Sequence, residues 1–142
     1  MEVSQVRKRL KTAIDSSRDR AQRRRERAAA AQRAYATFLE EVATPIARQL
    51  ANALKVEGYA FTVSTPGAGL RLASDRARED FIELELDTSG DQPEVVARIS
   101  HQRGSRTIDQ EMPVKPGAAP EEIGEEEILD LFVRALEPWL ER

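Results

Sequence analysis

No cysteine occurs in the 142 residues, and there is one histidine, His101. The lack of cysteine excludes disulfides, thiolate metal sites and a thiol nucleophile, and a single histidine excludes any site that needs several imidazoles. Apolar runs are only a few residues long, whereas a helix that crosses a bilayer needs about 18 or more. The first ten residues carry Arg7, Lys8 and Arg9 without the apolar segment of a secretory signal, so we expect a cytoplasmic protein.

Glycine and proline are both missing from the first 34 residues, which consist mainly of Ala, Arg, Gln, Lys and Glu. These side chains lose little rotational freedom in a helix, so the composition predicts a basic helical arm over residues 1–34 that is about 50 Å long. The arm holds eleven basic residues against four acidic ones, a net charge of +7, whereas residues 108–142 hold three against ten, a net charge of −7. The chain is therefore basic at one end and acidic at the other.

A short apolar stripe opens this arm. Its members are three or four positions apart, which places them on one helical face: Val3, Val6, Leu10 and Ile14. Continuing the heptad register puts Arg20, Arg24 and Arg27 at the seam, so a long coiled coil would bury guanidinium groups without partners and is not expected. The stripe is short for a membrane-surface helix and has no Trp or Phe, which favours burial against protein.

A second apolar face at helical spacing begins at Tyr35 and is interrupted by Thr44-Pro45 before a stop at Gly58. Threonine is a good helix cap and proline suits the first helical position, so this point either starts a new helix or kinks a single long one. Glycine tolerates positive φ after the last turn, which makes Gly58 the expected end of the helix.

From Tyr59 onward the apolar period changes from helical spacing to strict alternation, which predicts strands that are buried on one face. Short turns separate the alternating segments, as is typical of antiparallel connections. We expect an antiparallel sheet of about five strands, at residues 59–64, 70–72, 81–87, 95–99 and 107–114.

A last helix is expected to start among Glu121–Glu127, where acidic side chains oppose the positive end of the helix dipole. Pro138 should bend or end this helix. The acidic run is also suited to a basic partner, including the arm of a second copy, although helix-start electrostatics explains it as well. The expected apolar face consists of Ile128, Leu129, Phe132, Val133, Leu136, Trp139 and Leu140.

Together these patterns predict an α+β core domain over residues 35–142. Its antiparallel sheet is covered on one face by the helix from Tyr35 and by the C-terminal helix. The arm over residues 1–34 is left outside this core, so it either lies in solvent or binds a partner.

The arginines of the arm are the candidate nucleic-acid contacts, because guanidinium groups bind phosphate oxygens in pairs and each neutralised phosphate releases counterions. Two observations favour a solvated face instead. Asp15, Asp19 and Glu26 are interspersed among the arginines, and eighteen Arg against four Lys, with twenty Ala, is the bias of a GC-rich genome. No aromatic residue lies among them for stacking on single-stranded bases. The candidate contacts are Arg20, Arg23, Arg24, Arg25 and Arg27.

The strand carboxylates and the single histidine are expected to have structural roles, not metal-binding or catalytic ones. Glu83 and Glu85 alternate along one strand opposite outward-facing Arg71 and Arg98, so a cross-strand ladder of charges is expected rather than a metal site. His101 has the strand parity of the buried residues before it, which is typical of a partly buried edge histidine.

No catalytic motif is present. Gly67 and Gly69 lie between strands without a following helix, which excludes a phosphate loop and a dinucleotide fingerprint, and there is no nucleophile elbow or zinc-protease motif. We therefore expect neither an enzyme nor a bound cofactor or metal, and the sequence implies no small molecule, although a fold of this kind can open a cavity between sheet and helices.

The order of a basic helical arm, a small antiparallel sheet opening at Gly67-Ala68-Gly69-Leu70 and a closing acidic helix is similar to the YbaB family of nucleoid-associated proteins. The resemblance implies a dimer that binds DNA. Two additional strands depart from that family, and we do not assign the chain to it.

The leading hypothesis is a non-enzymatic interaction module or adaptor that self-associates, as a homodimer, or binds a protein partner through Val3, Val6, Leu10 and Ile14. An apolar stripe that has no core to join in its own monomer is typical of an interface. The alternative is a protein that binds nucleic acid without sequence preference, through the arginines of the arm.

Overall fold

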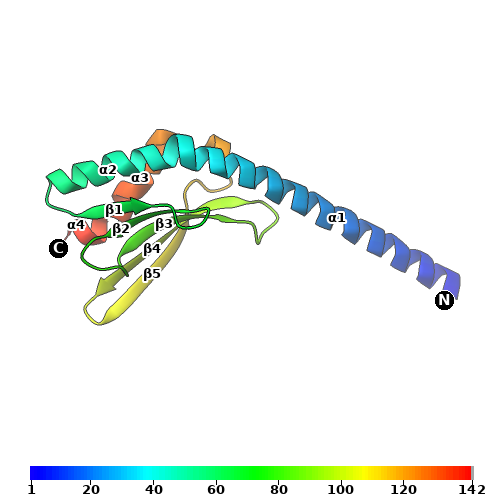
Figure 1. Ribbon diagram of the computed structural model, residues 1–142. Helices are drawn as coiled ribbons and strands as arrows, with labels where there is room; N and C mark the ends of the chain where they lie inside the picture. Colours follow the sequence, from blue (N-terminus) through cyan, green and yellow to red (C-terminus); the bar gives the residue numbers. More distant parts are fainter. Residues whose placement is uncertain (142) are drawn as a thin grey trace.

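The computed structural model describes residues 1–141, and Figure 1 shows their arrangement. The helical elements are α1 (Val3–Phe38), the π-helical segment η1 (Leu39–Ala43), α2 (Thr44–Val56), the 3-10 turn η2 (Pro120–Glu122), α3 (Glu125–Ala135) and α4 (Glu137–Leu140). The strands are β1 (Phe61–Ser64), β2 (Leu70–Ser74), β3 (Phe81–Asp87), β4 (Glu94–Arg103) and β5 (Arg106–Pro113).

The five strands form one antiparallel sheet in which each strand pairs with its neighbours in the chain, in the order β1-β2-β3-β4-β5. The helices lie on one face of this sheet, and the N-terminal half of α1 extends away from it (Figure 1). The predicted α+β fold is confirmed, with a long N-terminal helix, five antiparallel strands and a C-terminal helix on the same side as α2.

The strand register gathers the apolar side chains on the helix-covered face. Ile82 lies opposite Ile99, and Leu84 lies between Leu70 on one neighbouring strand and Ala97 on the other. All five side chains are buried. Full burial of a residue such as Leu or Ile is worth about 1.5–3 kcal/mol, so this alternation is what holds the helices to the sheet.

The helix continues through Thr44-Pro45 without a break. Pro45 has no N–H, and its ring would crowd the carbonyl one turn earlier in a regular α-helix. The π-helical segment η1 ends immediately before Thr44, and its wider turn makes room for the proline. The backbone stays helical there, with φ −65° and ψ −45° at Thr44, so α1, η1 and α2 form one long helix.

This long helix ends where the glycine predicts. Gly58 has φ +90°, a conformation that glycine adopts without strain. The N–H of Tyr59 then donates to the carbonyl oxygen of Leu54 at 2.8 Å, which satisfies one of the last helical carbonyls. The chain turns back toward β1 from this point.

The buried face of the C-terminal helix agrees with the predicted one at Ile128, Phe132, Leu136 and Trp139 and differs from it elsewhere. Pro138 does interrupt it, because α3 ends at Ala135 and α4 starts at Glu137. The expectation that Leu129, Val133 and Leu140 face the core is wrong, since all three are exposed. The side chains turned toward the core are Ile128, Leu131, Phe132, Ala135, Leu136 and Trp139. The helix has apolar residues on two sides, and only packing decides which side is covered.

Asp80 fastens the C-terminal helix to the sheet. Its side chain is 4% exposed and accepts hydrogen bonds from the indole Nε1–H of Trp139, at 3.0 Å, and from the backbone N–H of Gln102, at 2.8 Å. The Trp139 ring also packs edge-on against Phe61 and against His101. One carboxylate before β3 therefore connects β4 with α4.

We predict that Asp80→Ala destabilises the protein by about 2–4 kcal/mol, because the buried indole N–H of Trp139 and the part-buried N–H of Gln102 lose their acceptor. The free energy of unfolding in urea measures this effect. Asp109→Ala, at an exposed carboxylate on β5, is the matched control and should change stability by less than about 0.5 kcal/mol. Equal stabilities of the two variants would contradict the role given to Asp80.

Candidate interaction surface on the N-terminal helix

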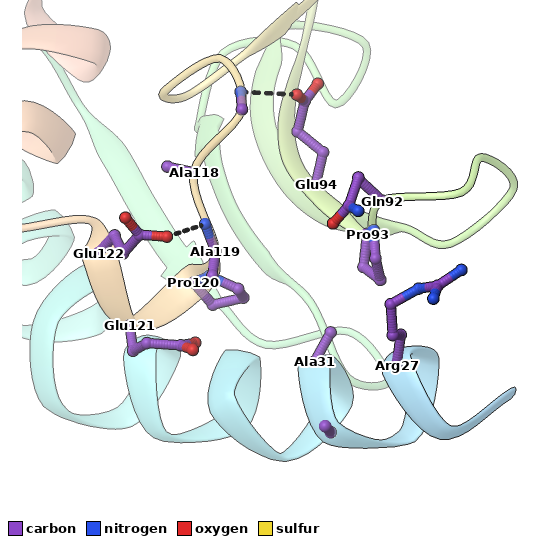
Figure 2. Close-up of a pocket in the computed structure, with 12 residues that line it drawn as sticks. Arg27, Ala31, Gln92, Pro93, Glu94, Ala118, Ala119, Pro120, Glu121 and Glu122 are labelled. Carbon is purple, nitrogen blue, oxygen red and sulfur yellow. Dashed lines mark hydrogen bonds between the residues drawn. The ribbon is translucent and has the colours of Figure 1, made fainter. Parts of the chain in front are cut away.

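Helix α1 makes its first contact with the sheet domain at Arg27, where two loops meet it (Figure 2). The Nε–H of Arg27 donates to the carbonyl oxygen of Asp91 in the turn between β3 and β4, at 3.2 Å. Ala31 on the next turn lines a pocket of about 250 Å³ with Pro93 from that turn and Pro120 from η2. The small alanine side chain leaves room for the two prolines beside the helix.

The carboxylates in this pocket hold its walls together. Glu94 accepts a hydrogen bond from the N–H of Gly117 at 3.2 Å, and Glu122 accepts one from the N–H of Ala119 at 2.9 Å. Both bonds fix the loop between β5 and η2 beside α1 (Figure 2). Because two of its three carboxylates bind backbone donors of its own walls and the third, Glu121, is exposed, we interpret the pocket as the place where α1 is held against the domain, here called the seat of the helix.

Residues 3–26 precede this seat and are here called the free arm. Their side-chain hydrogen bonds within residues 1–141 stay inside the helix, such as Gln22 to Glu26 at 3.1 Å and Arg25 to Gln22 at 2.7 Å. Almost every side chain of the arm is exposed. At about 1.5 Å per residue, the free arm extends roughly 36 Å beyond the sheet domain (Figure 1).

The apolar stripe lies along this free arm. Its four side chains are 40–69% exposed, and within residues 1–141 no helix combines the length and apolar character needed to span a membrane. Ile14, Ala21, Ala28 and Tyr35 are spaced seven residues apart, which is about two helical turns, so they lie on one face of α1. The stripe is therefore on the same face that packs on the sheet from Tyr35 onward. The members of the stripe are Val3, Val6, Leu10 and Ile14.

Tyr35 is the first fully buried side chain of α1 and marks where the packed half of the helix begins. Burial raises the pKa of its phenol well above the usual range, and the nearby charges of Glu85 and Glu83 add to this effect. The same helical face is thus covered at Tyr35 and uncovered from Ile14 to Val3.

The arginines of the arm are exposed and surround the stripe. Arg7 and Arg18 flank it on one side, and Arg20 and Arg24 flank it on the other, whereas Asp15 and Asp19 point away from it on the far side of the helix. The ion pairs within residues 1–141 lie in the sheet domain, so none of them joins a carboxylate of the arm to these arginines. Of the five candidate nucleic-acid contacts, Arg27 belongs to the seat and Arg20, Arg23, Arg24 and Arg25 to the free arm.

The expected charge ladder occupies the uncovered face of the sheet. Arg71 pairs with Glu83 at 2.6 Å, Arg98 approaches Glu85 at 4.0 Å, and the Arg71 guanidinium lies 4.2 Å above the ring of Phe81. These contacts confirm the cross-strand ladder. Within residues 1–141 no group of three or more His, Asp or Glu side chains is placed to hold a metal ion.

His101 lies far along β4 and takes no part in this surface. It is on the helix-covered face, as its parity predicted, and its ring centroid lies 5.8 Å from that of Trp139. The expectation of a partly buried edge histidine is wrong, because only 7% of the residue is exposed and β4 lies between β3 and β5, so His101 is part of the core beneath α4.

Searches of protein families, curated proteins and solved structures gave no match for this chain.

We predict that backbone amides of the free arm exchange with solvent much faster than those of α2. The arm is held only by its own helical hydrogen bonds and frays from its exposed end, whereas α2 opens only when its packing on the sheet is lost. Hydrogen exchange followed by mass spectrometry or NMR measures the difference. Equal protection at Leu10 and Leu54 in the isolated protein at low concentration would show that the arm is covered.

Proposed function

We propose that this protein is a non-enzymatic, cytoplasmic interaction module that binds a protein partner or a second copy of itself through the free arm. The observation that supports this proposal is the exposure of all four members of the apolar stripe on a helix that extends away from its own core. Exposed apolar faces of this kind, rimmed by charged residues, are typical of helix-in-groove recognition.

The size of the stripe indicates what else the partner must supply. Covering four side chains that are already about half buried contributes roughly 4 kcal/mol. Loss of translational and rotational freedom on association costs about 4–15 kcal/mol, so the apolar contact alone gives weak binding at best. A partner that binds well therefore also contacts the flanking arginines, and its surface beside the apolar groove is acidic.

We predict that the double variant L10S/I14S loses the association that the free arm mediates. Static light scattering of the purified proteins measures self-association, and affinity capture compares the partners retained by each form. The matched control is Q5S/T12S, which introduces two serines on the opposite face of the same helical turns without a change of charge. Identical masses and identical retained partners for the wild type and L10S/I14S would refute the proposal.

The alternative function is binding of nucleic acid without sequence preference. Its support is that Arg20, Arg23, Arg24 and Arg25 are exposed on an arm about as long as one turn of a DNA duplex. Such binding would use the phosphate backbone, since no aromatic residue of the free arm can stack on bases.

Charge reversal separates the two functions. R23E/R25E should abolish phosphate binding and leave both the apolar stripe and the flanking Arg7, Arg18, Arg20 and Arg24 unchanged. A mobility shift with duplex DNA at about 50 mM salt, lost in this variant and weakened steeply by added salt, would support the alternative. The absence of any shift for the wild type at that salt would exclude it.

A further inference from the structure

The outward face of α3 carries two apolar side chains that the fold does not cover. Leu129 is 40% exposed and Val133 is 46% exposed. They are one helical turn apart, so they form a continuous apolar patch on the surface. We call this pair the α3 patch.

Carboxylates border the α3 patch. Glu125 and Glu126 precede it in the first turn of the helix, and Asp130 lies beside both of its members. All three residues are exposed. Lys115 pairs with Glu127 at 3.0 Å, and Arg134, the basic residue of α3, donates from its Nε to the carbonyl oxygen of Asp130 at 3.4 Å. Three carboxylates against this one arginine leave the border of the patch with a net negative charge.

Glu127 differs from these three carboxylates because its side chain is already engaged. Its Oε1 accepts a hydrogen bond from the N–H of Gly124 at 3.0 Å, and this bond together with Lys115 lowers the pKa of its carboxyl. Glu127 therefore belongs to the start of α3, and Glu125, Glu126 and Asp130 are the groups that face solvent around the patch.

The α3 patch and the free arm have complementary patterns. The arm presents Leu10 and Ile14 one turn apart with Arg7 and Arg18 along their flank, and α3 presents two apolar residues one turn apart with carboxylates along theirs. Apolar contact in the centre and opposite charges at the rim are the arrangement that interfaces between proteins use.

The arm cannot reach the α3 patch of its own chain. Helix α1 is continuous from Val3 into the packed half, and Figure 1 shows the arm pointing away from the side where α3 lies. Two arms are also poor partners for each other, because stripe-to-stripe contact would bring their flanking arginines together. A second copy of the chain offers the acidic patch without either obstacle.

We propose that the free arm of one copy binds the α3 patch of a second copy. This inference rests on the proposed function and names the partner of the apolar stripe. Leu10 and Ile14 contact Leu129 and Val133, and the positive charges of Arg7 and Arg18 border the same contact as the negative charges of Glu126 and Asp130. When two copies exchange arms reciprocally, the contact forms twice and closes as a dimer.

Charge-swap variants test this pairing. R7E/R18E places acidic residues on the arm, and E126R/D130R places basic residues around the α3 patch, so each variant alone opposes like charges and its dissociation constant should rise at least about tenfold. An equimolar mixture pairs the acidic arm with the basic patch and the wild-type arm with the wild-type patch, so association should return to within about threefold of the wild type. Analytical ultracentrifugation at about 0.15 M salt measures both.

The matched control is K8E/R23E, which makes the same change of net charge on the face of the arm opposite the stripe. It should associate within about threefold of the wild type, because screened charges away from the contact matter little. Circular dichroism checks that each variant is folded, and the single-chain combination R7E/R18E/E126R/D130R, which restores opposite charges within one sequence, should associate like the wild type.

Three outcomes overturn the pairing: a wild type that is monomeric at every concentration, swap variants that associate like the wild type, or a mixture that does not recover. The apolar variant L129S/V133S separates this inference from the proposed function. Association that is lost in L10S/I14S and kept in L129S/V133S rejects the α3 patch and keeps the arm as a binding surface. Association that is kept in both variants rejects the arm itself.

Discussion

The backbone hydrogen bonds of α1 continue without interruption from the half of the helix that packs on the sheet into the half that extends from it. This continuity fixes the direction of the free arm. A helix bends sharply only at a proline, a glycine pair or an irregular turn, and residues 1–34 contain neither proline nor glycine. The arm therefore cannot fold back onto its own sheet, and the exposure of the apolar stripe follows from this constraint.

The seat at Arg27 and Ala31 defines where the arm begins. Two loops from the same end of the sheet, the β3–β4 turn and the segment between β5 and η2, meet α1 at this point. On the N-terminal side of the seat, the helix face that is buried at Tyr35 is exposed at Ile14, although its residues are still apolar. The apolar face of the long helix therefore extends beyond the part of the helix that the sheet domain covers.

Most of the fold could be predicted from the sequence, because local patterns determine it. Alternation in β3 and β4 identified the face that is buried, and Gly58 identified the end of the long helix. Thr44-Pro45 allowed two interpretations, since a proline at this point fits either the start of a new helix or a kink in a single long one. The sequence did not decide between them: the structure shows a π-helical segment before Thr44, with buried side chains on both sides of the proline at Phe38 and Ala47.

The sequence by itself determined the helical arm, its apolar stripe, its positive charge and the antiparallel sheet. Each of these follows from the spacing or composition of residues that are close together in the chain. Only the tertiary structure decided that Leu129 and Val133 lie outside, because Leu131 and Ala135 compete with them for the core and the winner depends on the sheet beneath. It also decided that Arg27 belongs to the seat of the helix, since its partner Asp91 is far away in the chain and is brought to it by the β3–β4 turn.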